Sequence, residues 1–427
     1  MDNTVQKLKE YLDYSPSQYH AVENLKQMLL QAGYMQLNEA EHWELQTGKC
    51  YFVIRGGSAL IAFRIPKGKP TGFMMSAAHS DRPTFKVKEN GELTGVYTRL
   101  ATEKYGGMLI STWLDRPLSI AGRVMVETAE GMKSRLVNID KDLLLIPNVA
   151  IHMNRKANEG YTWNPAVDTL PLAGGKDAAG KLQAKLEETA GGKIISHDLY
   201  LYLRQKASLW GVSEEFISAQ GLDDLACVFG CAQGFLQAKP GSNVPVLCVF
   251  DGEEVGSATV QGADSTFLEN VLSRICYSCD WDMECLLSQS FMVSADNGHA
   301  IHPNHPEYAD ANNAPVVNGG VTLKYNAAQK YTTDAISAGI FRMVCKKAGV
   351  KVQTYYNRAD LPGGSTLGNI SLAHIAVPTA DIGLPQLAMH SSMETAGVED
   401  VRDLVSAMTV YYESTVETTG FDGYCVK

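Results

Sequence analysis

The pattern of apolar and polar positions predicts an α/β fold. Short, dense apolar runs bounded by polar or glycine-containing segments predict buried strands at 50–54, 59–65, 71–78, 244–250 and 291–295. A capping serine with a following proline predicts that a helix begins at Ser15-Pro16, and Gly33 predicts its end. Further helices are expected at 224–237, 266–274 and 333–348, and a strand pair at 352–356 and 376–381.

The block after about residue 88 interrupts this alternation. It carries strand-like pieces at 118–126, 134–138 and 143–146, and a polar Gly/Ala/Lys-rich segment at 173–192 that predicts a surface excursion. A chain of 427 residues is also long for one ordinary core. We therefore expect an α/β domain formed by 1–88 and 216–427, split by a β-rich inserted domain at 89–215.

Composition narrows the classes of partner. A net charge of −10 argues against nucleic acid and against anionic membranes. No run of 18 apolar residues occurs, and the N-terminal sequence lacks a secretory signal pattern. Nine cysteines, several within apolar runs, suit reduced thiols, so a cytoplasmic protein is expected. Cys276 and Cys279 have the spacing of half a zinc site, but no second pair follows.

Acidic and imidazole side chains gather at the predicted strand ends. The pair Glu253-Glu254 follows the strand at 244–250, in the region where open α/β sheets bind their ligands. Taken singly, Glu253-Glu254 could be a solvated turn, Asp223 a helix cap and Asp296 a turn residue. The complete ordered set is less readily explained in this way: His79, Asp81, Asp223, Glu253, Glu254, Asp296 and His390.

Oxygen and imidazole ligands without thiolates suit zinc, manganese or cobalt. Two histidines and three carboxylates suffice for two ions that share one bridging carboxylate. Such a pair of ions activates a water molecule and stabilises a tetrahedral intermediate. One glutamate then remains free to move protons.

Longer motifs extend through nearly the whole chain. They are SPSQYHAV, SAAHSDRPTFKVK, IPNVAIHMNR, GLDDLACV, FDGEEVGSATVQGADS, SADNGHAIHPNHPE, LKYNAAQKYTT, GGSTLGNI and GLPQLAMHSSMETAG. In this order they resemble the M18 family of metallo-aminopeptidases, the aspartyl aminopeptidases, among the dinuclear zinc exopeptidases. The resemblance implies a zinc-exopeptidase-like mixed sheet flanked by helices, with an inserted β-rich dimerisation domain. It implies hydrolysis of the N-terminal residue of peptides, with a preference for Asp or Glu.

The resemblance also implies a ligand set. His79 and Asp296 would hold one divalent ion, Glu254 and His390 the other, and Asp223 would bridge them. Zinc is the expected metal, with manganese or cobalt as alternatives.

Three further features around these ligands follow from the same resemblance. Glu253 would be the general base, and Asp81 would accept the free ring N–H of His79. The Asp223–Asp224 peptide bond would be cis, and the family commonly has Asn where this chain has Asp224.

The resemblance also implies the substrate-binding residues. Lys324 would pair with an acidic substrate side chain, and Tyr331 would hydrogen-bond near the scissile carbonyl. The remaining expectations are that His152 enters a neighbouring subunit's active site, that His299 and His302 are pocket or supporting residues, that His305 is structural, and that the backbone of 363–366 lines the peptide site.

The resemblance further implies dimers that assemble into a tetrahedral dodecamer. Two alternatives stay open at this point. One is the related M42 type of aminopeptidase with neutral or broad specificity, although HSDRP and QLAMHSSMETAG favour M18. The other is a non-catalytic assembly or cargo protein on the same scaffold, against which the complete ligand set and base argue.

Overall fold

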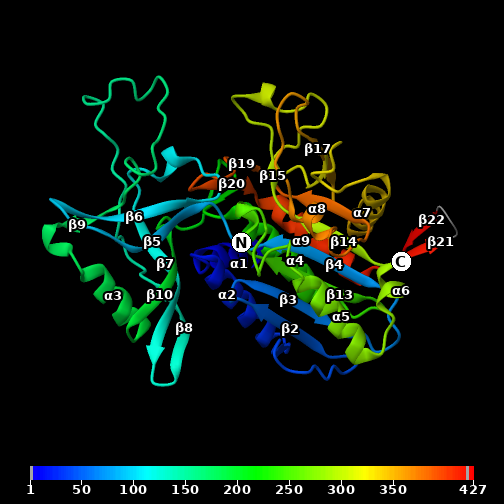
Figure 1. Ribbon diagram of the computed structural model, residues 1–427. Coiled ribbons are helices and arrows are strands. Elements are labelled where there is room, and N and C mark those ends of the chain that lie inside the picture. Colours follow the sequence, from blue (N-terminus) through cyan, green and yellow to red (C-terminus); the bar gives the residue numbers. More distant parts are fainter. Residues whose placement is uncertain (1–2, 420–422) are drawn as a thin grey trace.

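The computed structural model describes residues 3–419 and 423–427. Its centre is a nine-stranded mixed sheet, seen on the right of Figure 1. In sheet order the strands are β1 (Met35–Leu37), β2 (Cys50–Arg55), β3 (Ala59–Arg64), β13 (Val244–Phe250), β4 (Phe73–His79), β14 (Phe291–Ala295), β18 (Thr379–Gly383), β16 (Val321–Tyr325) and β17 (Val352–Tyr356).

The middle four strands, β13, β4, β14 and β18, run parallel to one another. In this register Phe250 pairs with His79, so the last residues of β13 and β4 lie side by side. The carboxyl ends of β13, β4 and β14 therefore meet at one edge of the sheet, where the polar residues that follow them come together.

Helices cover both faces of this sheet. One face packs against α1 (Asn3–Asp13), α2 (Gln18–Gln31), α4 (Leu222–Gln237), α7 (Ala335–Ala348) and α9 (Val398–Glu413). The other packs against α5 (Phe267–Cys279), α6 (Met283–Leu287) and α8 (Leu367–Ser371). Alternate residues of β13 divide between the two cores, with Leu247 in the first and Cys248 in the second. Its continuous apolar run follows from burial on both faces.

A second, antiparallel sheet lies beside the first, on the left of Figure 1. Its strands are β8 (Gly131–Asn138), β7 (Leu118–Thr128), β10 (Ile194–Leu203), β5 (Thr84–Leu93), β6 (Tyr97–Tyr105) and β9 (Leu172–Gly175), and α3 (Lys181–Ala190) belongs to the same part. This sheet has its own apolar core around Phe85 and Trp113. The segment 147–171 forms turns and an extended loop that projects above β6 in Figure 1.

The remaining elements are short. A five-stranded sheet contains β11 (Ser208–Trp210), β12 (Phe216–Ala219), β20 (Glu394–Gly397), β19 (Pro385–Leu387) and β15 (Gly298–His299). A hairpin pairs β21 (Val416–Thr419) with β22 (Gly423–Val426). The 3₁₀ turns are η1 (Ile110–Trp113), η2 (Lys176–Ala178), η3 (Glu253–Val255) and η4 (Pro306–Tyr308). Within the described residues, no helix combines the length and apolar character needed to cross a membrane.

Two expectations for the inserted block are wrong. Residues 143–146 form no strand and make only single bridges, Leu118 to Leu144 and Leu145 to Leu172. The segment 173–192 is not a plain surface excursion, because it contains α3. Leu182, Leu186 and Ala190 recur at helical spacing and pack on the core of the second sheet.

Candidate metal centre

A cavity of about 310 Å³ opens at the sheet edge where β13, β4 and β14 end. Its lining includes all five predicted ligands, His79, Asp223, Glu254, Asp296 and His390, and the predicted base, Glu253. These residues come from five separate segments of the chain, and the fold brings them into one place.

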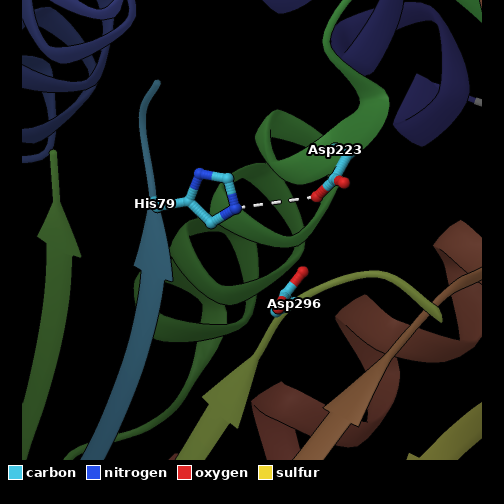
Figure 2. Close-up of side chains that lie close together, drawn as sticks. All are labelled: His79, Asp223 and Asp296. Atoms are coloured by element: carbon cyan, nitrogen blue, oxygen red, sulfur yellow. Dashed lines mark ion pairs between the residues drawn. The ribbon is translucent and has the colours of Figure 1, made fainter. Parts of the chain in front are cut away.

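The carboxylate of Asp223 faces both histidines. Its Oδ1 lies 3.6 Å from Nε2 of His79, and its Oδ2 lies 3.6 Å from Nε2 of His390. Oε2 of Glu254 lies 3.5 Å from the same nitrogen of His390. Figure 2 shows His79 and Asp296 close to Asp223, with the ring of His79 directed toward the Asp223 carboxylate.

These donors form overlapping groups. His79, Asp223 and Asp296 offer ligand atoms that all lie within 4.8 Å of one another, and so do Asp223, Glu254 and His390. Asp223 is common to both groups. The pattern fits two cation sites that share one carboxylate.

Local backbone geometry aims these side chains. Gly252 has a φ of +79°, and the left-handed turn there lets the chain leave β13 and enter η3, which carries Glu253 and Glu254. Gly221 has a φ of +69° before α4. The Asp223–Asp224 bond is cis, which confirms the expectation from the sequence.

Asp81 contacts His79 and the main chain of Glu253 and Glu254. Nδ1 of His79 lies 3.1 Å from the backbone oxygen of Asp81 and 3.3 Å from its carboxylate Oδ1, so both groups of Asp81 are placed to fix the histidine tautomer. The same carboxylate accepts the backbone N–H groups of Glu253 and Glu254 at 3.2 and 3.1 Å. It also accepts the hydroxyl of Tyr105 at 2.8 Å.

The electrostatics of the cluster favour a cation. Burial, and then repulsion from neighbouring carboxylates, raise the pKa of Glu253 to about 8. Burial likewise raises the pKa of Asp296 to about 6 and that of Glu254 well above its usual range. Oδ1 of Asp223 and Oε1 of Glu254 are buried acceptors without a hydrogen-bond donor among the described residues. Crowded carboxylates with free lone pairs fit a divalent ion, and the N/O donor set suits zinc.

The comparison with known proteins agrees with this chemistry. The family model described as "Aminopeptidase I zinc metalloprotease (M18)" matches residues 11–412. The chain belongs to the M18 family. It is therefore a zinc metallo-aminopeptidase, a hydrolase, and the M42 and non-catalytic alternatives are left without support.

Relatives of this M18 aminopeptidase match over nearly their whole length. "Probable M18 family aminopeptidase 2" of Clostridium novyi (strain NT) is 43% identical, with 94% of this chain and 97% of the relative covered. The structure titled "Cryo-EM structure of the Ape4 and Nbr1 complex" has a TM-score of 0.93 at 34% identity, covering 96% of this chain and 85% of that one. A dodecamer of mApe1 from S. cerevisiae has a TM-score of 0.85 at 27% identity, with 96% of both chains covered.

The M18 aminopeptidase contains two carboxyl groups whose contacts were not foreseen. Glu394 is buried and accepts the backbone N–H of Asp223 at 3.0 Å and that of His390 at 2.7 Å. Asp224 is also buried, and its Oδ2 accepts the backbone N–H of His79 at 3.2 Å. Burial raises the pKa of both side chains well above the usual range. Glu394 lies within the motif GLPQLAMHSSMETAG, but nothing in its spacing signals a role in the site.

Several predicted substrate residues line the same cavity. They are His299, Lys324 and Tyr331, together with the segment 364–366. Lys324 is buried, and its Nζ donates to the backbone oxygens of Asp296 and Asn297 at 2.7 and 3.3 Å. Nζ also lies 3.5 Å from Oδ2 of Asp296. The ammonium of Lys324 therefore contacts a predicted ligand directly, which the sequence did not indicate.

Two predicted residues lie outside this cavity. His152 occupies an exposed turn of the segment 147–171 and is absent from the cavity lining of its own chain. His302 lines a neighbouring cavity of about 350 Å³, which shares His299 with the first. His305 lines that second cavity too, and its Nδ1 lies 3.0 Å from Oε1 of Glu307.

Proposed function

We propose that this M18 aminopeptidase uses two zinc ions and removes Asp or Glu from the N-terminus of peptides. The observation that supports the two-ion site is the carboxylate of Asp223, whose two oxygens face different histidines at 3.6 Å. In this proposal His79 and Asp296 hold one ion, Glu254 and His390 hold the other, and Asp223 bridges them.

When bound, zinc polarises the scissile carbonyl and lowers the pKa of a water molecule. Glu253 takes a proton from the attacking water. The water oxygen forms a bond with the carbonyl carbon, the C–N bond breaks, and Glu253 passes the proton to the leaving amine. The backbone N–H of Glu253 donates to Asp81, and the Glu253 side chain lines the cavity. Its carboxylate could also form a ligand group with His79 and Glu254, and this proposal assigns it to proton transfer instead.

Lys324 supports the acidic preference through its charge. Its pKa is raised because Asp296 and other neighbouring groups outweigh the effect of burial, so the side chain stays protonated. Because its Nζ donates to the backbone oxygens of Asp296 and Asn297 and lies 3.5 Å from Oδ2 of Asp296, we expect the ammonium to act on a substrate carboxylate mainly through its electric field. Tyr331 lies beside it, with Nζ of Lys324 5.1 Å from the ring centroid. We assign the Tyr331 hydroxyl to the scissile carbonyl.

The same proposal assigns 1–88 and 216–427 to the catalytic domain and 89–215 to dimerisation. The segment 147–171 exposes Val149, Ile151 and Met153, an apolar surface suited to a second copy of the chain. Such a contact would carry His152 into the partner's cavity. The dodecameric mApe1 relative supports assembly into a dodecamer. We propose that this dodecamer is tetrahedral and that the protein is cytoplasmic.

The test is hydrolysis of Asp-, Glu- and Leu-anilides before chelation, after chelation and after zinc is restored. The proposal expects Asp and Glu to be released faster than Leu, with loss on chelation and recovery with zinc. Faster release of Leu would overturn the acidic preference and keep the mechanism. Full activity after complete removal of metal would overturn the mechanism itself.

A further inference from the structure

The segment that follows β6 of the six-stranded sheet touches both halves of the candidate metal centre. Tyr105, the last residue of β6, donates its hydroxyl to Oδ2 of Asp81 at 2.8 Å. Two residues later, the backbone oxygen of Gly107 lies 2.5 Å from Nδ1 of His390. One short segment thus contacts the supporting carboxylate of His79 and the ring of His390 directly.

Gly106, between these two residues, packs against Glu254. Its φ is +75°, and a Cβ placed there would lie 3.1 Å from Cβ and 3.3 Å from Oε2 of Glu254. The absence of a side chain at Gly106 therefore allows the segment to approach this predicted ligand closely.

The segment continues to hold the loop around His390. The backbone N–H of Leu109 donates to the oxygen of His390 at 3.0 Å. Oγ1 of Thr112 accepts the backbone N–H of Ser392 at 2.9 Å, and the hydroxyl of Ser392 donates to the oxygen of Thr112 at 2.6 Å. These bonds join the segment after β6 to the loop that carries His390.

Tyr105 is itself held in a defined position. Its backbone pairs with Thr84 in the sheet, and its ring meets Tyr200 edge-to-face with centroids 5.5 Å apart. Its hydroxyl hydrogen bond leaves Oδ1 of Asp81 directed at His79 and at the backbone N–H of Glu253. Loss of the hydroxyl would remove one side-chain donor to the Asp81 carboxylate and leave it held by the backbone N–H groups of Glu253 and Glu254. We expect the carboxylate, and the ring of His79 that it contacts, to be less precisely placed.

We propose that the segment 105–112 is a positioning element for the metal centre and that Tyr105 is its principal positioning residue. This inference rests on the proposed function, because it takes His79, Glu254 and His390 as zinc ligands. It makes zinc affinity depend on a residue of the six-stranded sheet, outside the part that supplies the ligands.

The test compares Tyr105→Phe with Tyr202→Phe. Tyr202 lies in β10 of the same sheet and donates its hydroxyl to Oδ1 of Asn138 at 2.7 Å, away from the cavity. Both variants lose one phenol hydroxyl and keep the ring. The measurements are zinc affinity by competition with a chromophoric chelator, kcat and KM on an Asp-anilide, and thermal unfolding of the metal-free proteins.

We expect Tyr105→Phe to weaken zinc binding and lower kcat by about tenfold each, with KM within about twofold of the wild type. Tyr202→Phe should match the wild type in zinc affinity and kcat. Gly106→Ala places a methyl group against Glu254 and should also weaken zinc binding. If Tyr105→Phe does not fold, the zinc affinity of Gly106→Ala tests the inference instead.

Equal zinc affinity and kcat in Tyr105→Phe and Tyr202→Phe would overturn the inference, as would unchanged zinc binding in Gly106→Ala. If the wild type still binds zinc and cleaves the Asp-anilide, such a result overturns only this inference and leaves the proposed function standing. A wild type that neither binds zinc nor cleaves would overturn the proposed function and this inference with it.

Discussion

The backbone N–H of Asp223 donates a 3.0 Å hydrogen bond to Oε2 of Glu394. The other oxygen, Oε1, accepts the backbone N–H of His390 at 2.7 Å, where the main chain has a φ of +65°. The buried carboxylate of Glu394 thus connects the main chain of Asp223 with the main chain of His390. Glu394 stabilises the relative placement of the two main chains rather than touching the substrate.

Glu394→Gln should weaken zinc binding and lower kcat by about 10- to 100-fold. The variant keeps one acceptor oxygen, but its NH₂ group cannot accept, so one of the two N–H groups loses its partner. Asp400→Asn is the matched control, because Asp400 is also buried and accepts two backbone N–H groups, from Asn318 and Gly320, at 2.6 and 2.8 Å. Both variants should lose about 1–3 kcal/mol of stability, and only the first should lose zinc affinity. Equal zinc affinity in the two would contradict this role.

Asp223→Asn and Asp224→Asn should behave differently although the residues are neighbours. An amide at 223 has one oxygen with which to replace two, so at least one zinc ion should be lost together with most of the turnover. An amide at 224 keeps the acceptor for the N–H of His79 at nearly the same volume, so turnover within about threefold of the wild type is expected. Zinc content per chain and anilide turnover measure both. Loss of zinc from Asp224→Asn, with Asp223→Asn unaffected, would reverse the assignment.

Lys324→Met should affect both stability and specificity. The substitution removes a buried ammonium and leaves the backbone oxygens of Asp296 and Asn297 without their donor. Breaking a buried charged pair costs about 3–5 kcal/mol of stability, measured by denaturant unfolding. In kcat/KM, cleavage of Asp- and Glu-anilides should fall further than cleavage of Leu-anilide. An equal fall for all three substrates would show that Lys324 only holds Asp296 in place.

Metal-free protein should lose stability as the pH rises. Unfolded carboxyl groups titrate near pH 4, whereas the folded pKa is about 6 for Asp296 and about 8 for Glu253. Between these values the native state holds protons that the unfolded chain has released, so stability falls with increasing pH through this window. Thermal unfolding with chelator from pH 5 to 8 measures this, and Glu253→Gln should flatten the upper part of the curve. A midpoint that rises over this range in chelator would contradict the expected direction.

Much of the sheet was predictable from local patterns, as was the set of acidic and imidazole residues that line the cavity, whereas their roles as ligands follow from the family resemblance. Strand β13 is apolar on both faces, so its run of seven residues is visible in the sequence, as is the acidic pair that follows it. The structure also contains α1 and α9, which are not among the expected helices, although their buried residues recur at helical spacing, as with Val401, Leu404, Val405 and Met408 in α9. In those helices the signal was present in the sequence.

The supporting residues of the site had no such signal. Tyr105 donates to Asp81 and Glu394 accepts from Asp223 across sequence separations of 24 and 171 residues. The role proposed for Gly106 depends on its closeness to Glu254, which a side chain at this position would contact. Relationships of this kind depend on which distant segments meet in the fold, and periodicity along the chain does not describe this.

A two-zinc site bridged by Asp223, with Glu253 as the base, is tested most directly by zinc content per chain and Asp-anilide turnover, measured together for the wild type and Glu253→Gln. We expect two zinc ions per chain in both proteins, with kcat of the variant lowered by about 10³-fold. Turnover of the variant equal to that of the wild type, with both zinc ions bound, would contradict it.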